Sequence, residues 1–446
     1  MKVFLDFEPA LRRNLIIFFG ASLCFWAGLA GMLPNLSLYI ESFGASNQEI
    51  GWVMAAFALG LLGLRPKMSR FTDSQGRKPA LLIGIVVIAI APLLYLSVGL
   101  VPAVTLTLPV IGWQVNSAVA LLGLIRAFHG ISIAAFATAY SASVADMAPS
   151  QNRGELIGYM SLANPIGMAL GPALGGYLQG SFTLAFLTMT ALGVVGTLCV
   201  LVSREPPRPP AYHLTYESAT GQARSQARSQ TKSQAKPQNR SFWRLIFAPH
   251  IRIPAVILLM VGIAFGSMVA FVPLYVRETG IAINIGLIYT VSAIASFSIR
   301  VVSGKASDQL GRGRFISLGL ICYTLAMFTL ALSTSAPMLL LAGALQGVGS
   351  GTLIPIIAAL MTDRSRPNER GLTFGLCLTG FDLGIALAGP GMGQIADASS
   401  YAVVFALSGL MTFIGLLIFI TTSSKDLSHS VRFALRGGRD VYALKS

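Results

Sequence analysis

Twelve long apolar runs dominate the sequence, and each is long enough to cross a lipid bilayer as a helix, which takes about 20 mostly apolar residues. The 446 residues are 54% hydrophobic and only 11% charged, whereas a soluble domain carries about 25% charged residues. A soluble fold is therefore excluded, and we expect an all-α membrane protein. Its predicted spans are residues 14–39, 49–68, 79–100, 118–143, 155–178, 182–203, 251–275, 283–303, 315–334, 337–361, 372–396 and 402–423.

The spans form two sets of six, separated by a polar segment at residues 204–250. The centre of this segment, residues 222–238, reads QARSQARSQTKSQAKPQ. Such a composition cannot bury a core, so we predict a disordered linker. It is either a flexible tether or a basic stretch attracted to anionic lipid headgroups. The expected organisation is a first six-helix bundle over residues 1–203, the linker, a second six-helix bundle over 251–424, and a tail over 425–446.

The basic residues mark one face of the membrane. The chain holds 32 Lys and Arg against 17 Asp and Glu, a net charge of +15. With twelve spans, all of these basic residues except Arg126 and Arg277 fall on the side that carries both termini. Cytoplasmic loops collect Lys and Arg. We therefore expect both termini in the cytoplasm, in a bacterial inner (plasma) membrane. The charge then reflects topology, and the expected partner is the lipid bilayer and not a nucleic acid.

The two sets of spans repeat one pattern of glycines and aspartates. A glycine precedes an aspartate by 22 residues near the second and eighth spans, and by 16 residues near the fourth and tenth. The pairs are Gly51–Asp73 and Gly286–Asp308, then Gly130–Asp146 and Gly347–Asp363. Two parallel six-helix repeats are typical of a transporter whose binding site lies between the halves.

The loops after the second and eighth spans resemble the loop signature of the major facilitator superfamily. The first loop reads Ser69-Arg-Phe-Thr-Asp73-Ser-Gln-Gly76-Arg77-Lys78, with serine where the family has glycine, and the second reads Gly304-Lys-Ala-Ser-Asp308-Gln-Leu-Gly311-Arg312. Arg126-Ala-Phe-His129-Gly130 resembles the fourth-span motif of this family. Residues 167–176 resemble the fifth-span motif of its 12-span drug/proton antiporters. The resemblance covers residues 12–424 and implies two pseudo-symmetric six-helix bundles.

The loop motif predicts either an ordinary charged turn or a cytoplasmic latch. Gly76 permits a tight turn, and Asp73 precedes a helix whose positive end favours a carboxylate. We expect Arg65, Arg77 and Lys78 to surround Asp73. Under the latch hypothesis, these ion pairs form in one conformation and break in the other. The second copy places equivalent groups at Arg300, Gly304, Asp308, Gly311 and Arg312.

The fifth span carries a row of small residues. Gly167, Gly171 and Gly175 recur every four residues and share one helix face, so a neighbouring helix can approach closely. Pro172 favours a bend there. Gly389 and Pro390 hold the comparable place in the eleventh span. The row is either simple tight packing or a seam between the halves that slides during transport.

Two charged residues lie deep in predicted spans. An arginine inside the membrane costs at least about 2.5–3.5 kcal/mol, so Arg126 either snorkels to the outer interface or binds substrate or a coupling ion in a cavity. Asp382 is predicted to carry a proton, the alternative being an ion-pair partner for Arg126. His129 is either a proton relay or a hydrogen-bonded structural residue. Asn164 is a candidate for an uncharged polar contact.

These features predict a secondary transporter that moves a small organic molecule by alternating access, with proton-coupled efflux as the expected activity. The first alternative is an importer or facilitator of the same superfamily, and a distant alternative is a polytopic membrane enzyme or receptor. We expect no catalytic residues, no metal and no cofactor. The expected partners are the substrate, protons and lipid, and the expected state is a monomer.

Overall fold

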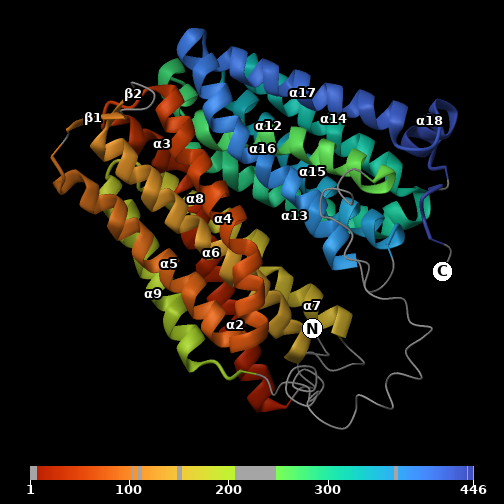
Figure 1. Ribbon diagram of the computed structural model, residues 1–446, viewed down its shortest axis with the longest axis horizontal. Helices are drawn as coiled ribbons and strands as arrows, with labels where there is room; N and C mark the ends of the chain where they lie inside the picture. Colours follow the sequence, from red (N-terminus) through yellow and green to blue (C-terminus); the bar gives the residue numbers. More distant parts are fainter. Residues whose placement is uncertain are drawn as a thin grey trace.

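The protein consists of two bundles of long helices (Figure 1). The computed structural model describes residues 8–102, 104–108, 113–147, 153–205, 248–365, 370–438 and 440–444. The first bundle comprises α2 (Pro9–Ala30), α3 (Leu33–Glu41), α4 (Asn47–Gln75), α5 (Arg77–Ser97), α6 (Ser117–Met147), α7 (Arg153–Ser161), α8 (Ala163–Tyr177) and α9 (Phe182–Val202). The second comprises α12 (Pro249–Thr279), α13 (Ile285–Leu310), α14 (Arg312–Ala331), α15 (Ala336–Asp363), α16 (Arg370–Ala398) and α17 (Tyr401–Thr422).

Every predicted span corresponds to helix in the described residues. Eleven helical segments there are long and apolar enough to cross a membrane, the first being α2 and α3 together. The fifth predicted span is divided at Leu162 into α7 and α8, each too short to cross alone. Pro165 explains this break, because it has no N–H to bond the carbonyl of Ser161 one turn earlier. The predicted all-α, two-bundle membrane fold is thus confirmed. The centre of the predicted linker lies outside the described residues.

Local capping residues set where many of these helices begin. Ser46 and Glu49 form a reciprocal capping box at the start of α4. The side chains of Ser181, Asn284 and Ser400 accept backbone N–H bonds at the first turns of α9, α13 and α17. Such caps satisfy donors that the first helical turn leaves free. They keep the ends of spans near the membrane surface from fraying.

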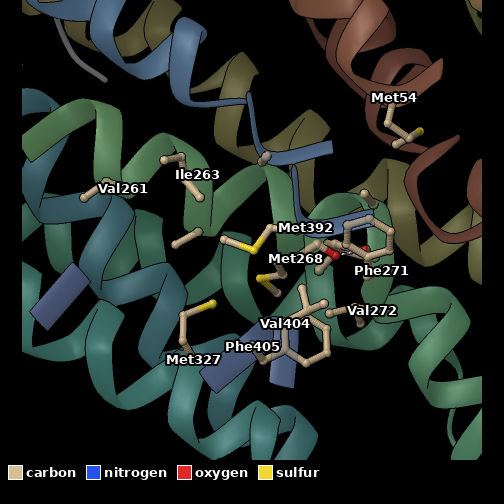
Figure 2. Close-up of a cluster of buried hydrophobic side chains, with 14 of the residues drawn as sticks. Met54, Val261, Ile263, Met268, Phe271, Val272, Met327, Met392, Val404 and Phe405 are labelled. Carbon is tan, nitrogen blue, oxygen red and sulfur yellow. Dashed lines mark hydrogen bonds between the residues drawn. The ribbon is translucent and has the colours of Figure 1, made fainter. Parts of the chain in front are cut away.

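The core of the second bundle is built around α12 (Figure 2). Met268 and Phe271 of α12 pack with Met327 of α14, Met392 of α16 and Phe405 of α17, all of them buried. Unbranched methionine side chains fill irregular gaps between helices. In the first bundle, Phe25 and Phe136 stack with their ring centroids 4.0 Å apart. The Phe25–Phe136 pair belongs to a buried cluster made of first-bundle residues alone. The larger cluster around α12 also includes first-bundle residues such as Leu36 and Tyr39, so it joins the two bundles.

A two-stranded hairpin and one further helix lie outside the predicted spans. Strands β1 (Thr105–Leu108) and β2 (Trp113–Asn116) form an antiparallel hairpin between α5 and α6, preceded by the short helix η1 (Val98–Leu100). Helix α18 (Leu427–Arg436) packs on α14 and α17 at the end of the second bundle (Figure 1). The sequence had indicated only a tail at residues 425–446, and part of that tail is a docked helix.

The two bundles meet at one end of the molecule and diverge toward the other (Figure 1). We call the end that holds Asp73, Asp308 and helix α18 the basic end. At the opposite end, the backbone N–H groups of Asn47 and Gln48 donate to Asp397 across the interface, at 3.0 and 2.9 Å. Arg277 also pairs with Glu41 there. These hydrogen bonds and this ion pair close the molecule at the opposite end.

Candidate transport site

A cavity of about 240 Å³ lies between the two bundles. Helices α2, α3, α4, α6 and α8 line it from the first bundle, and α12 and α16 line it from the second. Three charged side chains, Arg65, Arg126 and Asp382, reach it through walls that are otherwise mostly apolar and aromatic. A largely apolar pocket with a few convergent polar groups is the usual form of a small-molecule site.

Arg65 and Asp382 form an ion pair across this cavity. Nη1 of Arg65 lies 2.5 Å from Oδ2 of Asp382, and the Asp382 side chain is only 8% exposed. The sequence had placed Arg65 with Asp73 in the loop motif, and that assignment is wrong. Helix α4 continues to Gln75, so Arg65 lies ten residues before its end, or about 15 Å at 1.5 Å per residue. Arg65 is therefore a third charged residue deep in the site, and its ion pair with Asp382 links the two bundles.

Arg126 lies deep in the cavity wall and makes no ion pair among the described residues. Its residue is 5% exposed, its guanidinium carbon lies 4.4 Å from the centroid of the Phe57 ring, and Nη1 lies 3.4 Å from Nδ1 of His129. Its Nε atom is buried without a hydrogen-bond partner. The pairing of Arg126 with Asp382, left open by the sequence, does not form, and the side chain lines a cavity, as one of the sequence-based alternatives expected.

His129 supports Arg126 as a neutral acceptor. Its Nδ1 atom lies 3.4 Å from both Tyr95 Oη and Arg126 Nη1. Arginine has no acceptor, so Nδ1 must offer its lone pair, which a protonated imidazole does not have. The repeat partner of His129 is Gln346, a neutral residue that donates to Tyr323 at 2.8 Å. This geometry favours the structural interpretation of His129 over a proton relay.

Asn164 lies apart from the three charges. It lines a second cavity, of about 180 Å³, between α2, α6, α7 and α8, together with Ser22 and Tyr140. Trp26 lines both cavities. The structure therefore separates Asn164 from Arg126 and Asp382, with Trp26 as the shared wall between them.

The first loop motif is organised around Arg77. Its Nη1 lies 3.0 Å from Asp73 Oδ1, and its Nε lies 3.2 Å from Asp146 Oδ2. Gly76 adopts φ 110°, a conformation that side chains disfavour. Lys78 donates to the carbonyls of Leu201 and Ser203, at the end of α9. The expectation that Lys78 lies beside Asp73 is therefore wrong. Asp146 is the second ion-pair partner of Arg77, which the sequence did not predict.

The second loop motif repeats this arrangement. Arg312 lies 3.3 Å from Asp308 and 2.5 Å from Asp363, and Gly311 adopts φ 98°. Gly304 is exposed at the surface. Arg300, the repeat partner of Arg65, forms no ion pair among the described residues. The loops are thus pseudo-symmetric, whereas the deep charges are not.

The glycine row of the fifth span packs inside the first bundle. A Cβ on Gly167, Gly171 or Gly175 would lie within 3 Å of α2 or of Gly31, which follows it. Of the two alternatives that the sequence left open, this face shows tight packing within one bundle and does not form the seam between the bundles. The next residue, Gly176, does form such a seam, because its Cβ would lie 2.7 Å from the backbone of Gly286.

Residues beside the row complete the contact between the bundles. The carbonyl of Pro172 lies 2.0 Å from the position of a Cβ on Gly286, and the carbonyl of Gly51 lies equally close to a Cβ on Gly389. Pro390 follows Gly389 inside α16. A side chain on any of these glycines would clash with the facing helix. Small residues allow such close approach of two helices, so the glycine contacts Gly51–Gly389 and Gly176–Gly286 help to close the opposite end.

The described residues form two similar bundles, with eleven helical segments able to cross a membrane and a divided fifth span. The bundles are closed at one end around a cavity lined by charged residues. This arrangement defines a multi-pass membrane transporter. The Major Facilitator Superfamily model matches residues 18–308 and 282–436. The protein belongs to this superfamily, and the predicted resemblance to its drug/proton antiporter branch is confirmed.

Comparison with known proteins gives relatives along nearly the whole chain. Multidrug resistance protein MdtG of Dickeya zeae is 27% identical over 419 residues, which are 90% of this chain and 92% of that protein. The staphylopine export protein of Staphylococcus aureus is 23% identical over 91% of this chain and 94% of its own. The crystal structure of a mutant of the nucleoside transporter NupG superposes with a TM-score of 0.71 at 12% identity, over 91% of this chain and 99% of that one. This last likeness concerns the fold alone.

Proposed function

We propose that the protein exports a small organic molecule from the cytoplasm in exchange for protons, by alternating access. The observation that carries this proposal is the ion pair between Arg65 and the buried carboxylate of Asp382, which joins the two bundles at the cavity. A carboxylate this deep in the membrane must be paired or protonated. Protonation of Asp382 would remove the attraction to Arg65 and so change the equilibrium between the two arrangements of the bundles.

Similarity to known exporters supports an outward direction of transport. The fifth-span motif and the similarity to a multidrug resistance protein and to an export protein favour efflux. We place the protein in the plasma membrane as a monomer, with the basic end and both termini in the cytoplasm, because lysine and arginine collect there. In this orientation the conformation described above is closed to the outside.

The loop motifs then form latches at the cytoplasmic end. Arg77 and Arg312 each join two aspartates within one bundle. These pairs hold the ends of α4, α5 and α6, and of α13, α14 and α15, in fixed positions. Surface pairs contribute about 0–1 kcal/mol each, which is enough to bias two conformations of similar free energy. We infer that this surface closes against the other bundle when the transporter opens to the outside.

The test is a susceptibility and metabolite screen of a strain that lacks the protein beside one that overproduces it. Export predicts that overproduction lowers the intracellular level of at least one compound and that deletion raises it. Resistance to several unrelated compounds would indicate multidrug efflux, and a single accumulated metabolite would indicate a dedicated exporter. A compound whose uptake rises with overproduction would instead support the importer alternative.

A further inference from the structure

The cavity carries one positive charge that no carboxylate balances. Arg65 and Asp382 neutralise each other at 2.5 Å. Arg126, the third charged side chain of the lining, forms no ion pair with any residue that the structure describes. The described lining therefore has a net charge of +1 in a largely apolar setting, where an uncompensated charge is costly.

The partners that Arg126 does have are all neutral. They are the face of the Phe57 ring, the Nδ1 atom of His129, 3.4 Å from Nη1, and the Tyr95 hydroxyl. The Nε atom is buried and has no hydrogen-bond partner. A guanidinium offers five N–H donors arranged to match a carboxylate. The side chain is thus held in place by its surroundings while part of its donor capacity remains unused.

The remaining walls of the cavity are suited to an apolar body. Trp26, Phe57, Phe265 and Phe381 come from four different helices and all line it, and the rings of Phe265 and Phe381 lie 5.6 Å apart. A cationic substrate would have to displace Arg65 from Asp382 and would also face the charge of Arg126. An anion needs neither change.

We propose that the substrate is an amphipathic organic anion, whose carboxylate or similar acidic group binds Arg126 and whose apolar part lies against the aromatic walls. This inference rests on the proposed function and names its substrate class. Asp382 then remains available for the coupling proton, because the substrate is held by a different residue.

The test compares three probes of nearly equal shape: 1-naphthylacetate, its neutral amide, and the cation 2-(1-naphthyl)ethylammonium. Their binding to the purified full-length protein in lipid nanodiscs is measured by calorimetry, with empty nanodiscs subtracted. Charge-assisted hydrogen bonds favour the acid, and we expect it to bind at least about tenfold more tightly than the amide. The cation should bind most weakly.

Two variants of Arg126 and one control assign this preference. Arg126→Gln should reduce affinity for the acid to that of the amide while the amide is unchanged, and Arg126→Lys should retain part of the preference. The control, Arg252→Gln, removes an exposed arginine outside the cavity and should bind like the wild type. If Arg126→Gln does not fold, the relative affinities of the three probes for the wild type and for Arg126→Lys test whether Arg126 binds the acidic group.

Equal binding of acid and amide, tightest binding of the cation, or no binding of any probe to the wild type would overturn the anion inference. An acid preference that survives Arg126→Gln in folded protein would overturn it as well. None of these results would contradict the export proposal. That proposal is tested separately, by the intracellular level of the exported compound in the deletion and overproducing strains.

Discussion

The guanidinium of Arg65 on α4 lies 2.5 Å from the carboxylate of Asp382 on α16, so an ion pair joins the two bundles at the cavity. Removing one partner of a buried pair leaves the other charge uncompensated, whereas removing both does not. We therefore expect Asp382→Asn to lower the melting temperature of the purified protein more than the double variant Arg65→Gln/Asp382→Asn. Additive losses in this double-mutant cycle would argue against a coupled pair.

The contact between Gly51 and Gly389 closes the end opposite the basic end. A Cβ on Gly51 would lie 1.9 Å from the carbonyl oxygen of Gly389, so Gly51→Ala should force the helices apart and favour the conformation that is open at this end. A cysteine introduced at Met54, which lines the cavity, should then react faster with a membrane-impermeant thiol reagent added outside the cell.

Gly63→Ala is the matched control for this experiment. Gly63 lies on the same helix, and an added Cβ would meet no atom within 4 Å. This variant should label at the wild-type rate. Equal labelling of the Gly51 and Gly63 variants would contradict a closed glycine gate.

The loop latch predicts a transport defect without loss of protein. The Asp73 side chain is 64% exposed, and Arg77 keeps its second partner, Asp146, when Asp73 is changed. Asp73→Asn should therefore cost less than about 1 kcal/mol in stability and leave expression intact, while it lowers the rate of export. Unchanged export by this variant would reject the latch.

The docked tail should stabilise the second bundle. Asp440 accepts two bonds from Arg364, at 2.7 and 3.0 Å, and the Arg364 side chain is only 1% exposed. Breaking such a pair typically costs about 3–5 kcal/mol, so Asp440→Ala should lower the melting temperature clearly. The control, Asp426→Ala, removes an exposed cap of α18 and should have a smaller effect. The tail would be dispensable if the two variants melted alike.

Much of the fold could be predicted because a bilayer allows few solutions. Each span must be apolar over about 20 residues, so the runs themselves mark the helices. The turn glycines of the two loops were equally visible, since Gly76 and Gly311 precede basic residues at matching positions and adopt the positive φ angles that glycine favours.

The partners of the deep charges could not be predicted in the same way. Arg65 lies inside the predicted span 49–68, but its closeness to the end of that span suggested a loop residue, and the observed helix continues to Gln75. Periodicity also showed that Gly167, Gly171 and Gly175 share a face without showing which helix that face meets. Such facts depend on tertiary packing between segments that are far apart in the sequence, as in the 317 residues between Arg65 and Asp382.

The central claim, that Asp382 carries the coupling proton, is tested most directly in inverted membrane vesicles with an imposed pH gradient, read by quinacrine fluorescence. Addition of a compound that the wild type exports should dissipate the gradient in wild-type vesicles. In Asp382→Asn vesicles it should not, although exchange of labelled for unlabelled compound across the membrane continues. Full dissipation of the gradient by Asp382→Asn would contradict the account.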